Sequence, residues 1–143
     1  MALNYARWAG IATTASLLLA TPALATPPDP GVTGKVLWQR TVGDRDLILR
    51  EIHIPPGADN GWHYHDGPLY AWVKEGTLTH YDATCNPDGV YRTGRLLFER
   101  SGRDHVHTGR NLGKVEVVLK VLYVLPSGSP LSEDAANPGC SFG

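Results

Sequence analysis

Short apolar runs separated by turn residues dominate the chain after residue 34. Each run is bounded by Gly, Pro, Asp or Asn, and strands are therefore predicted at 35–42, 47–54, 62–65, 69–74, 77–82, 95–100, 104–111 and 115–125. The stretch 85–89 is predicted as a loop, and the Pro/Ser/Gly/Asn-rich tail 127–143 as irregular. After residue 25 no helical periodicity exceeds about two turns. Eight or nine short strands predict an all-β sandwich or barrel.

The run 115–125 has the clearest alternation of apolar and other residues. Under period two, one face is wholly apolar and consists of Val115, Val117, Leu119, Val121, Tyr123 and Leu125. The opposite face mixes charged and apolar residues, which is typical of an outer surface or a subunit contact. We therefore expect one buried face, and a homodimer formed through edge strands or through the mixed face.

The first 25 residues follow a different pattern. Arg7 supplies one positive charge, an apolar stretch of small residues covers 9–20, and Ala23-Leu24-Ala25 has the small-x-small form of a cleavage site. The apolar stretch is shorter than the ~20 residues that span a bilayer, which argues against the alternative of an uncleaved anchor. The prediction is a signal peptide at 1–25 and an exported mature chain, periplasmic or extracellular, with no stable membrane insertion after cleavage.

Length and charge limit the domain count and the partners. The chain has 143 residues, which predicts a single domain at 26–143 with a barrel core at about 35–126. Its net charge of −1 gives no electrostatic reason to expect nucleic acid or an anionic membrane as partner. A small-molecule ligand or substrate is the expected partner.

The chain contains two cysteines, Cys85 and Cys140. An oxidising compartment favours a disulfide between them, and a bridge closing a loop of this length is worth roughly 4 kcal/mol in the chain-entropy model. Such a bridge would tie down the C-terminal tail. The alternative is a pair of unrelated free thiols.

Four of the six histidines form two His-x-His pairs, His63/His65 and His105/His107. Residues two apart in a strand project from the same face, so each pair presents two imidazoles that one metal ion can bridge. Imidazole suits zinc, iron, copper and nickel. The pattern predicts a metal site built from these two pairs.

The other two histidines are expected to be structural. His53 precedes Pro55 at the end of a predicted strand, where a hydrogen-bonded role is the simpler interpretation. His80 shares a strand face with Leu78 and could line an internal cavity, but a structural role is favoured for it too.

The spacing around the first histidine pair resembles the first motif of the cupin family, Gly-x5-His-x-His-x3-Glu-x6-Gly. The corresponding positions are Gly57, His63, His65, Leu69 and Gly76, and every spacing matches. Leu69 stands where the family usually has a metal-binding glutamate.

The second cupin motif, Gly-x5-Pro-x-Gly-x2-His-x3-Asn, is matched less closely. Arg100 replaces the proline. Counting forward from Gly102 selects His105, whereas counting back from Asn111 selects His107. Both histidines remain candidates for the third ligand, and both could contribute.

The resemblance implies a cupin jelly-roll barrel that holds one divalent transition metal ion: iron, zinc, nickel, copper or manganese. Without the glutamate the ligands would all be histidines, which disfavours calcium and magnesium because those ions need oxygen ligands. An alternative interpretation of Leu69 is that the site has lost its metal.

Three functions follow from the resemblance. The first is a small-molecule oxygenase or isomerase that uses the histidine-bound metal, with no catalytic residue assigned beyond the ligands. The second is a non-catalytic extracytoplasmic protein that binds a metal or a small ligand. The third is a structural barrel whose cavity is filled by side chains.

Overall fold

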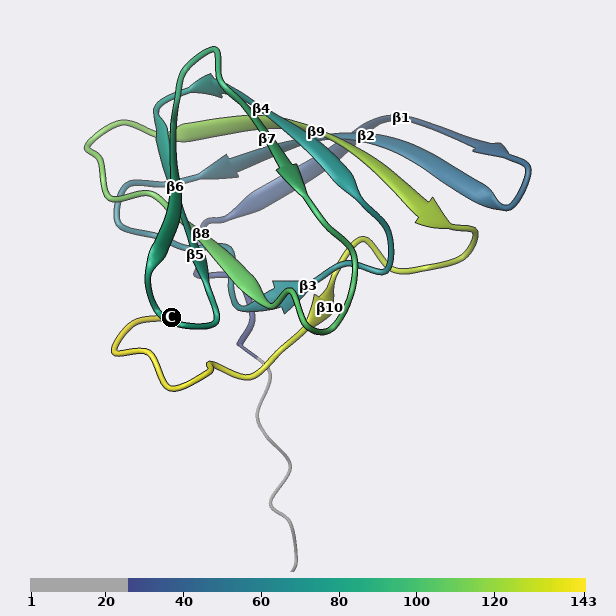
Figure 1. Cartoon of the computed structure of the whole chain (residues 1–143). Helices are drawn as coiled ribbons and strands as arrows, with labels where there is room; N and C mark the ends of the chain where they lie inside the picture. Colours follow the sequence, from purple (N-terminus) through teal and green to yellow (C-terminus); the bar gives the residue numbers. More distant parts are fainter. Residues whose placement is uncertain (1–25) are drawn as a thin grey trace, which may run out of the picture.

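The computed structural model describes residues 26–143, and the predicted signal peptide lies outside them. This part of the chain folds into strands, turns and loops without a helix, so it contains no helix that could span a membrane. Two five-stranded antiparallel sheets face each other (Figure 1). The predicted all-β class is confirmed.

The first sheet has the strand order β1-β2-β9-β4-β7. Its strands are β1 (Thr33–Val42), β2 (Arg45–Ile54), β9 (Val117–Pro126), β4 (Leu69–Glu75) and β7 (Leu96–Glu99). The hairpin of β1 and β2 extends well beyond the rest of the barrel (Figure 1).

The second sheet has the order β10-β3-β8-β5-β6. Its strands are β10 (Glu133–Asp134), β3 (His63–Tyr64), β8 (His107–Arg110), β5 (Thr77–Asp82) and β6 (Pro87–Arg92). Several of these strands are short, and they carry most of the residues of the site described below.

Strand β9 lies at the centre of the first sheet and shows the predicted alternation. Its buried face contributes Val117, Leu119, Val121, Tyr123 and Leu125 to the core. Val115 was predicted on this face, but the strand begins two residues later and Val115 is 64% exposed.

Two strands were not predicted. Strand β6 begins with Pro87, inside the stretch 85–89 predicted as a loop, and continues to Arg92. A proline is tolerated there because β6 is an edge strand that pairs with β5 alone, so no ladder bond is lost at its first residue. Strand β10 lies in the tail predicted as irregular, where Glu133 pairs with Tyr64 of β3. The two paired segments are far apart in the sequence, so the residues of β10 carry no local pattern that would predict a strand.

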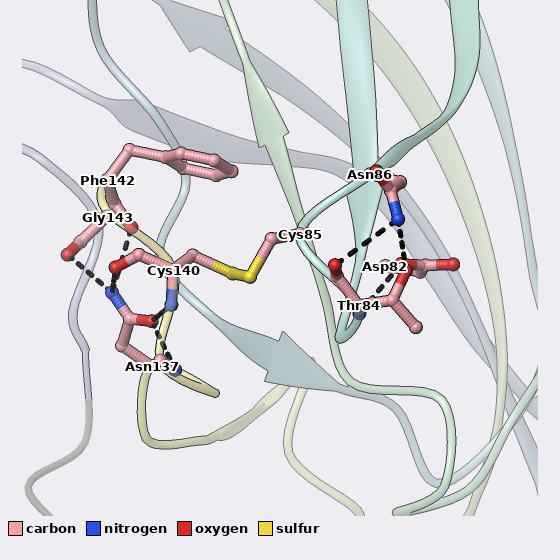
Figure 2. Close-up of a disulfide and its surroundings, with 9 residues drawn as sticks. Asp82, Thr84, Cys85, Asn86, Asn137, Cys140, Phe142 and Gly143 are labelled. Atoms are coloured by element: carbon pink, nitrogen blue, oxygen red, sulfur yellow. Dashed lines mark hydrogen bonds between the residues drawn. A yellow bond between two sulfur atoms is a disulfide. The ribbon is translucent and has the colours of Figure 1, made fainter.

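The two cysteines come together at bonding distance. The Sγ atoms of Cys85 and Cys140 lie 2.05 Å apart and join the β5–β6 turn to the C-terminal tail (Figure 2). The side chain of Asn137 donates hydrogen bonds to the carbonyl oxygens of Cys140 and Phe142, at 3.2 and 2.8 Å. The Phe142 ring packs against the ring of Trp62, with centroids 6.0 Å apart. The tail is therefore fixed against the second sheet.

Candidate metal centre

Three histidines and one glutamate converge inside the barrel. One candidate ligand atom from each of His63, His65, Glu99 and His107 lies within 4.8 Å of the others, and all four residues are buried. His63 lies on β3 and His107 on β8 of the second sheet, Glu99 lies on β7 of the first sheet, and His65 lies one residue beyond the end of β3. Segments that are far apart in the sequence thus meet at one point.

Strand pairing explains how the histidines of the two motifs meet. His63 and His107 are Cα partners in the antiparallel pair of β3 and β8, so their side chains leave the sheet on the same face. Their ring centroids are 4.4 Å apart. His65 follows two residues after His63, and its ring centroid lies 4.8 Å from that of His63.

Of the four paired histidines predicted as candidate ligands, His105 lies outside this group. Strand β8 begins at His107, and His105 lies in the preceding turn, where its amide donates to the carbonyl oxygen of Gly102 at 3.0 Å. The alternation of a strand does not apply there. His105 instead supplies its carbonyl oxygen to Nδ1 of His107, at 2.8 Å. The geometry favours His107 as the third histidine.

Sequence reasoning missed Glu99. This residue on β7 is the Cα partner of Leu69 on β4, so both side chains leave the sheet on the same face. The expectation of a ligand set without a carboxylate is therefore wrong, because the neighbouring strand offers one. A signal was present: Glu99 alternates with Leu97, a core residue, and is thus an acidic residue on a buried face.

The three clustered histidines have their Nδ1 atoms fixed by backbone carbonyl oxygens. His63, His65 and His107 face the carbonyl oxygens of Gly61, Leu131 and His105, at 2.8, 2.7 and 2.8 Å. A carbonyl oxygen only accepts, so Nδ1 carries the proton. A neutral ring then leaves its lone pair on Nε2, the arrangement that a metal ligand requires.

These lone pairs point toward a carboxylate, and that arrangement fits a cation. Oε2 of Glu99 lies 2.9 Å from Nε2 of His107 and 3.2 Å from Nε2 of His65. Burial and the neighbouring histidines lower the pKa of His63 to about 3, so this ring is neutral at neutral pH. Buried acceptors facing each other are unfavourable unless a positive charge lies among them. A divalent transition metal fits this mixed nitrogen and oxygen set.

His80 differs from the three clustered histidines because both its nitrogens face carboxylates. Nδ1 lies 2.5 Å from Oδ1 of Asp88, and Nε2 lies 3.4 Å from Oε1 of Glu99. Although burial opposes it, the hydrogen bonds to these two carboxylates raise the pKa of His80 to about 9. The ring is therefore an imidazolium at neutral pH. It holds one oxygen of Glu99 and leaves the other facing the histidines.

The charge on Glu99 is itself stabilised by its surroundings. Burial alone would raise the pKa of this carboxyl, but the histidines around it, His107 first, hold the pKa well below its usual range, so Glu99 is a carboxylate; in the metal-bound site the ion would supply the positive charge that faces it. His53 lies away from the group, where its Nδ1 contacts Glu116 at 2.9 Å, in keeping with its predicted structural role.

A cavity opens beside the cluster. Two adjoining pockets of about 90 and 30 Å³ share several lining residues, among them His63, His65 and Tyr123. The inner pocket has an apolar floor that includes Leu69 and Val121. A small molecule in this space would reach three of the four candidate ligands, His63, His65 and Glu99, whereas His107 lines neither pocket.

Comparisons with known proteins identify the fold. A scan against protein-family models finds no match, and neither does a search of curated proteins. The structure is similar to a cupin domain from Bordetella pertussis (21% identity, TM-score 0.53, 66% of this chain and 94% of that one). It is also similar to the polyketide cyclase RemF from Streptomyces resistomycificus (18%, 0.60, 87% and 90%) and to a Cupin 2 conserved barrel domain protein from Salinispora arenicola (11%, 0.53, 77% and 89%). The chain has the cupin β-barrel fold.

Proposed function

We propose that this cupin barrel binds one divalent transition metal ion and acts as an oxygenase or isomerase on a small organic molecule. The observation that carries the proposal is the convergence of four buried ligand atoms within 4.8 Å, with Nε2 left free on the three histidines. When bound, the metal would supply Lewis acidity or a redox centre. The protein's own residues would orient the ligands and leave the cavity side open to a substrate.

The fold is compatible with catalysis. The similar barrel of the Streptomyces protein is that of a polyketide cyclase, an enzyme that acts on an organic molecule. A shared fold does not define a reaction, so the reaction class rests on the donor set and on the adjoining cavity.

A non-catalytic binding protein is the second candidate function. Within residues 26–143, the cavity walls offer no free general base. Glu99 belongs to the ligand set, and burial raises the pKa of Tyr123 to about 12. Oδ1 of Asn60 already accepts from the amide of Gly109 at 2.7 Å. These features favour binding without proton transfer.

We also propose that the protein is exported. The cleavage-site pattern before residue 26 supports this, as does the proximity of Cys85 and Cys140, since disulfides persist in oxidising compartments. Export would place metal loading either before or after translocation.

Metal analysis of the purified protein tests the proposed site. We expect about one equivalent of a transition metal in the wild type, and a large loss in His63→Ala and in Glu99→Gln, which removes the charge but keeps the shape. His105→Ala is the matched control and should keep its metal, because the His105 ring is not one of the four clustered ligands and its hydrogen bond to Nδ1 of His107 comes from the backbone carbonyl oxygen. Equal trace metal in all four proteins would contradict the proposal.

Turnover separates the two candidate functions. The metal-loaded protein is incubated with small organic molecules in the presence of O2, and products and oxygen uptake are measured. An oxygenase consumes O2 and an isomerase forms product without it. A binding protein shows ligand-dependent thermal stabilisation alone.

A further inference from the structure

An arginine without an acidic partner lines the cavity beside the candidate metal centre. Arg50 lies on β2 and is the Cα partner of Val121, a core residue of β9, so its side chain leaves the sheet on the interior face. Among residues 26–143, Arg50 forms no ion pair within 4.0 Å, whereas Arg45 and Arg110 each lie beside an aspartate. Its charge is thus available to a ligand.

Gly34 makes room for the Arg50 guanidinium. A Cβ atom at position 34 would lie 2.2 Å from Nη2 of Arg50, so the head of this side chain lies directly against the backbone of β1. Space explains this glycine, because its φ is not in the left-handed region. The position of the guanidinium therefore depends on the residue at 34.

Cationic and neutral polar side chains line the outer pocket, and no carboxylate does. Its walls include Arg50, Tyr123, Asn60, His63 and His65, and none of its lining residues is acidic. The Arg50 guanidinium lies within hydrogen-bonding reach of the Tyr123 hydroxyl. A guanidinium beside a phenol hydroxyl is suited to an anion.

Charge balance also favours an anionic ligand. A divalent ion bound by neutral histidines and Glu99 leaves one net positive charge, and Arg50 adds another. A partly desolvated cation without a partner is unfavourable, and a carboxylate would supply that partner with two parallel hydrogen bonds. The pocket of about 90 Å³ limits the ligand to a small molecule.

We propose that the ligand of this site is a small organic acid whose carboxylate binds Arg50 while the rest of the molecule extends toward the metal position. This inference rests on the proposed metal-binding function and names its substrate class. Arg50 is then the residue that selects anionic over neutral ligands.

The test uses the full protein loaded with zinc, which is redox-inert, and measures the binding of lactate and of its neutral amide, lactamide, by calorimetry. We expect the wild type to prefer lactate by ~tenfold or more, and Arg50→Met to lose most of that preference with its zinc content unchanged. Arg50→Lys keeps the positive charge and should retain part of the preference for lactate.

Gly34→Ala provides a second variant that keeps the arginine. Its methyl group should displace the guanidinium and weaken lactate binding while leaving lactamide binding and zinc content unchanged. This variant still tests the inference if Arg50→Met fails to fold, and the thermal midpoint of each variant shows whether it does.

Two different results would overturn the inference. If zinc-loaded Arg50→Met, or Gly34→Ala in its place, keeps the full preference for lactate, the anion site is wrong and the metal site stands. If the wild type holds no zinc, the proposed function fails and the inference fails with it.

Discussion

Backbone carbonyl oxygens accept from Nδ1 of His63, His65 and His107, whereas His80 faces a carboxylate through each nitrogen. One residue type therefore has two roles within a few ångströms. The first three rings present lone pairs, and the fourth presents a donor to Glu99. These local hydrogen bonds, rather than the histidine count, determine which rings can bind a metal.

His80 and Asp88 should position Glu99 for the metal. His80→Ala removes the ring that contacts Oε1 of Glu99, so we expect metal affinity to fall by ~10–100-fold. Asp88→Asn removes the charge that holds the His80 ring, so we expect a fall of ~tenfold. Competition with a zinc chelator measures the affinity. Asp44→Asn, which makes the same change in the exposed β1–β2 turn, is the control. An unchanged affinity in His80→Ala would show that Glu99 needs no such support.

A glutamate at position 69 on β4 should be able to replace Glu99 of β7 as a metal ligand. Glu99→Leu should lose its metal, and adding Leu69→Glu should restore much of it, because the two positions are Cα partners and share the interior face. Metal per chain is the measurement.

Tyr70→Glu in the Glu99→Leu background is the matched control for this exchange. Residue 70 lies on the opposite face of β4 and is 50% exposed, so no recovery is expected. Recovery in this control, or its absence in Leu69→Glu, would mean that strand register does not govern the site.

His53 should make a small, pH-dependent contribution to stability. A hydrogen bond to Glu116 raises its pKa above 6.5, with burial opposing and Glu51 assisting. Its folded pKa exceeds its unfolded pKa, so the contribution is fully present below about pH 6.5 and is lost as pH rises through the folded value. The difference in unfolding free energy between wild type and His53→Gln should therefore shrink from about pH 5 to about pH 9. A constant difference would exclude this linkage.

The C-terminal segment links the disulfide to the metal centre. β10 pairs with β3, which carries His63, and the carbonyl oxygen of Leu131 accepts from Nδ1 of His65 at 2.7 Å. Cys140, six residues beyond β10, bonds to Cys85. The tail thus supports two candidate ligands, and the disulfide limits how far it can move away.

Removing the disulfide should weaken both stability and metal binding. The two cysteines are separated by 55 positions, so the chain-entropy model gives a loss of roughly 4 kcal/mol in Cys85→Ser/Cys140→Ser. Denaturant unfolding and chelator competition measure the two effects. Reductant should reproduce them in the wild type and change nothing in the double variant. Unchanged metal affinity would show that the C-terminal tail does not support the metal site.

At the level of elements, the features that depend on residues close together in the sequence were predicted. The alternation in β9 identified its buried face, and the His-x-His spacing identified three of the four clustered residues. Pairing between distant segments left no such mark, so β6, β10 and the role of Glu99 were missed. The position of His105 has the same origin, because the strand predicted from residue 104 begins only at His107.

At the scale of the whole molecule, no part of residues 26–143 covers the outer face of the first sheet. Cross-strand pairing places five apolar side chains in a row over all five strands of the first sheet: Trp38, Leu49, Leu122, Tyr70 and Phe98. The three aromatic members of the row are 48–53% exposed. Strand β1 at one edge is exposed along its whole length and pairs with β2 alone.

We propose that a second copy of the chain covers this face. With Trp72 and Leu96 beside the row, the exposed apolar side chains amount to roughly 500 Å², near the upper limit for a patch on a monomer. Polar neighbours would bring this toward the ~800 Å² per partner of a stable interface. Trp72→Glu should therefore shift a dimer to monomer in analytical ultracentrifugation.

Val90→Glu is the matched control for the dimer, because Val90 is 57% exposed but lies on the other sheet, away from the row. It should leave the association unchanged. The carboxylate of Trp72→Glu opposes dimer formation because it would have to be desolvated. The loss of the dimer should therefore persist at high salt, where simple charge repulsion is screened. A wild type that sediments as a monomer at all concentrations would instead assign this apolar face to a different partner. If Trp72→Glu and Val90→Glu dissociate the dimer equally, the interface does not lie on the first sheet.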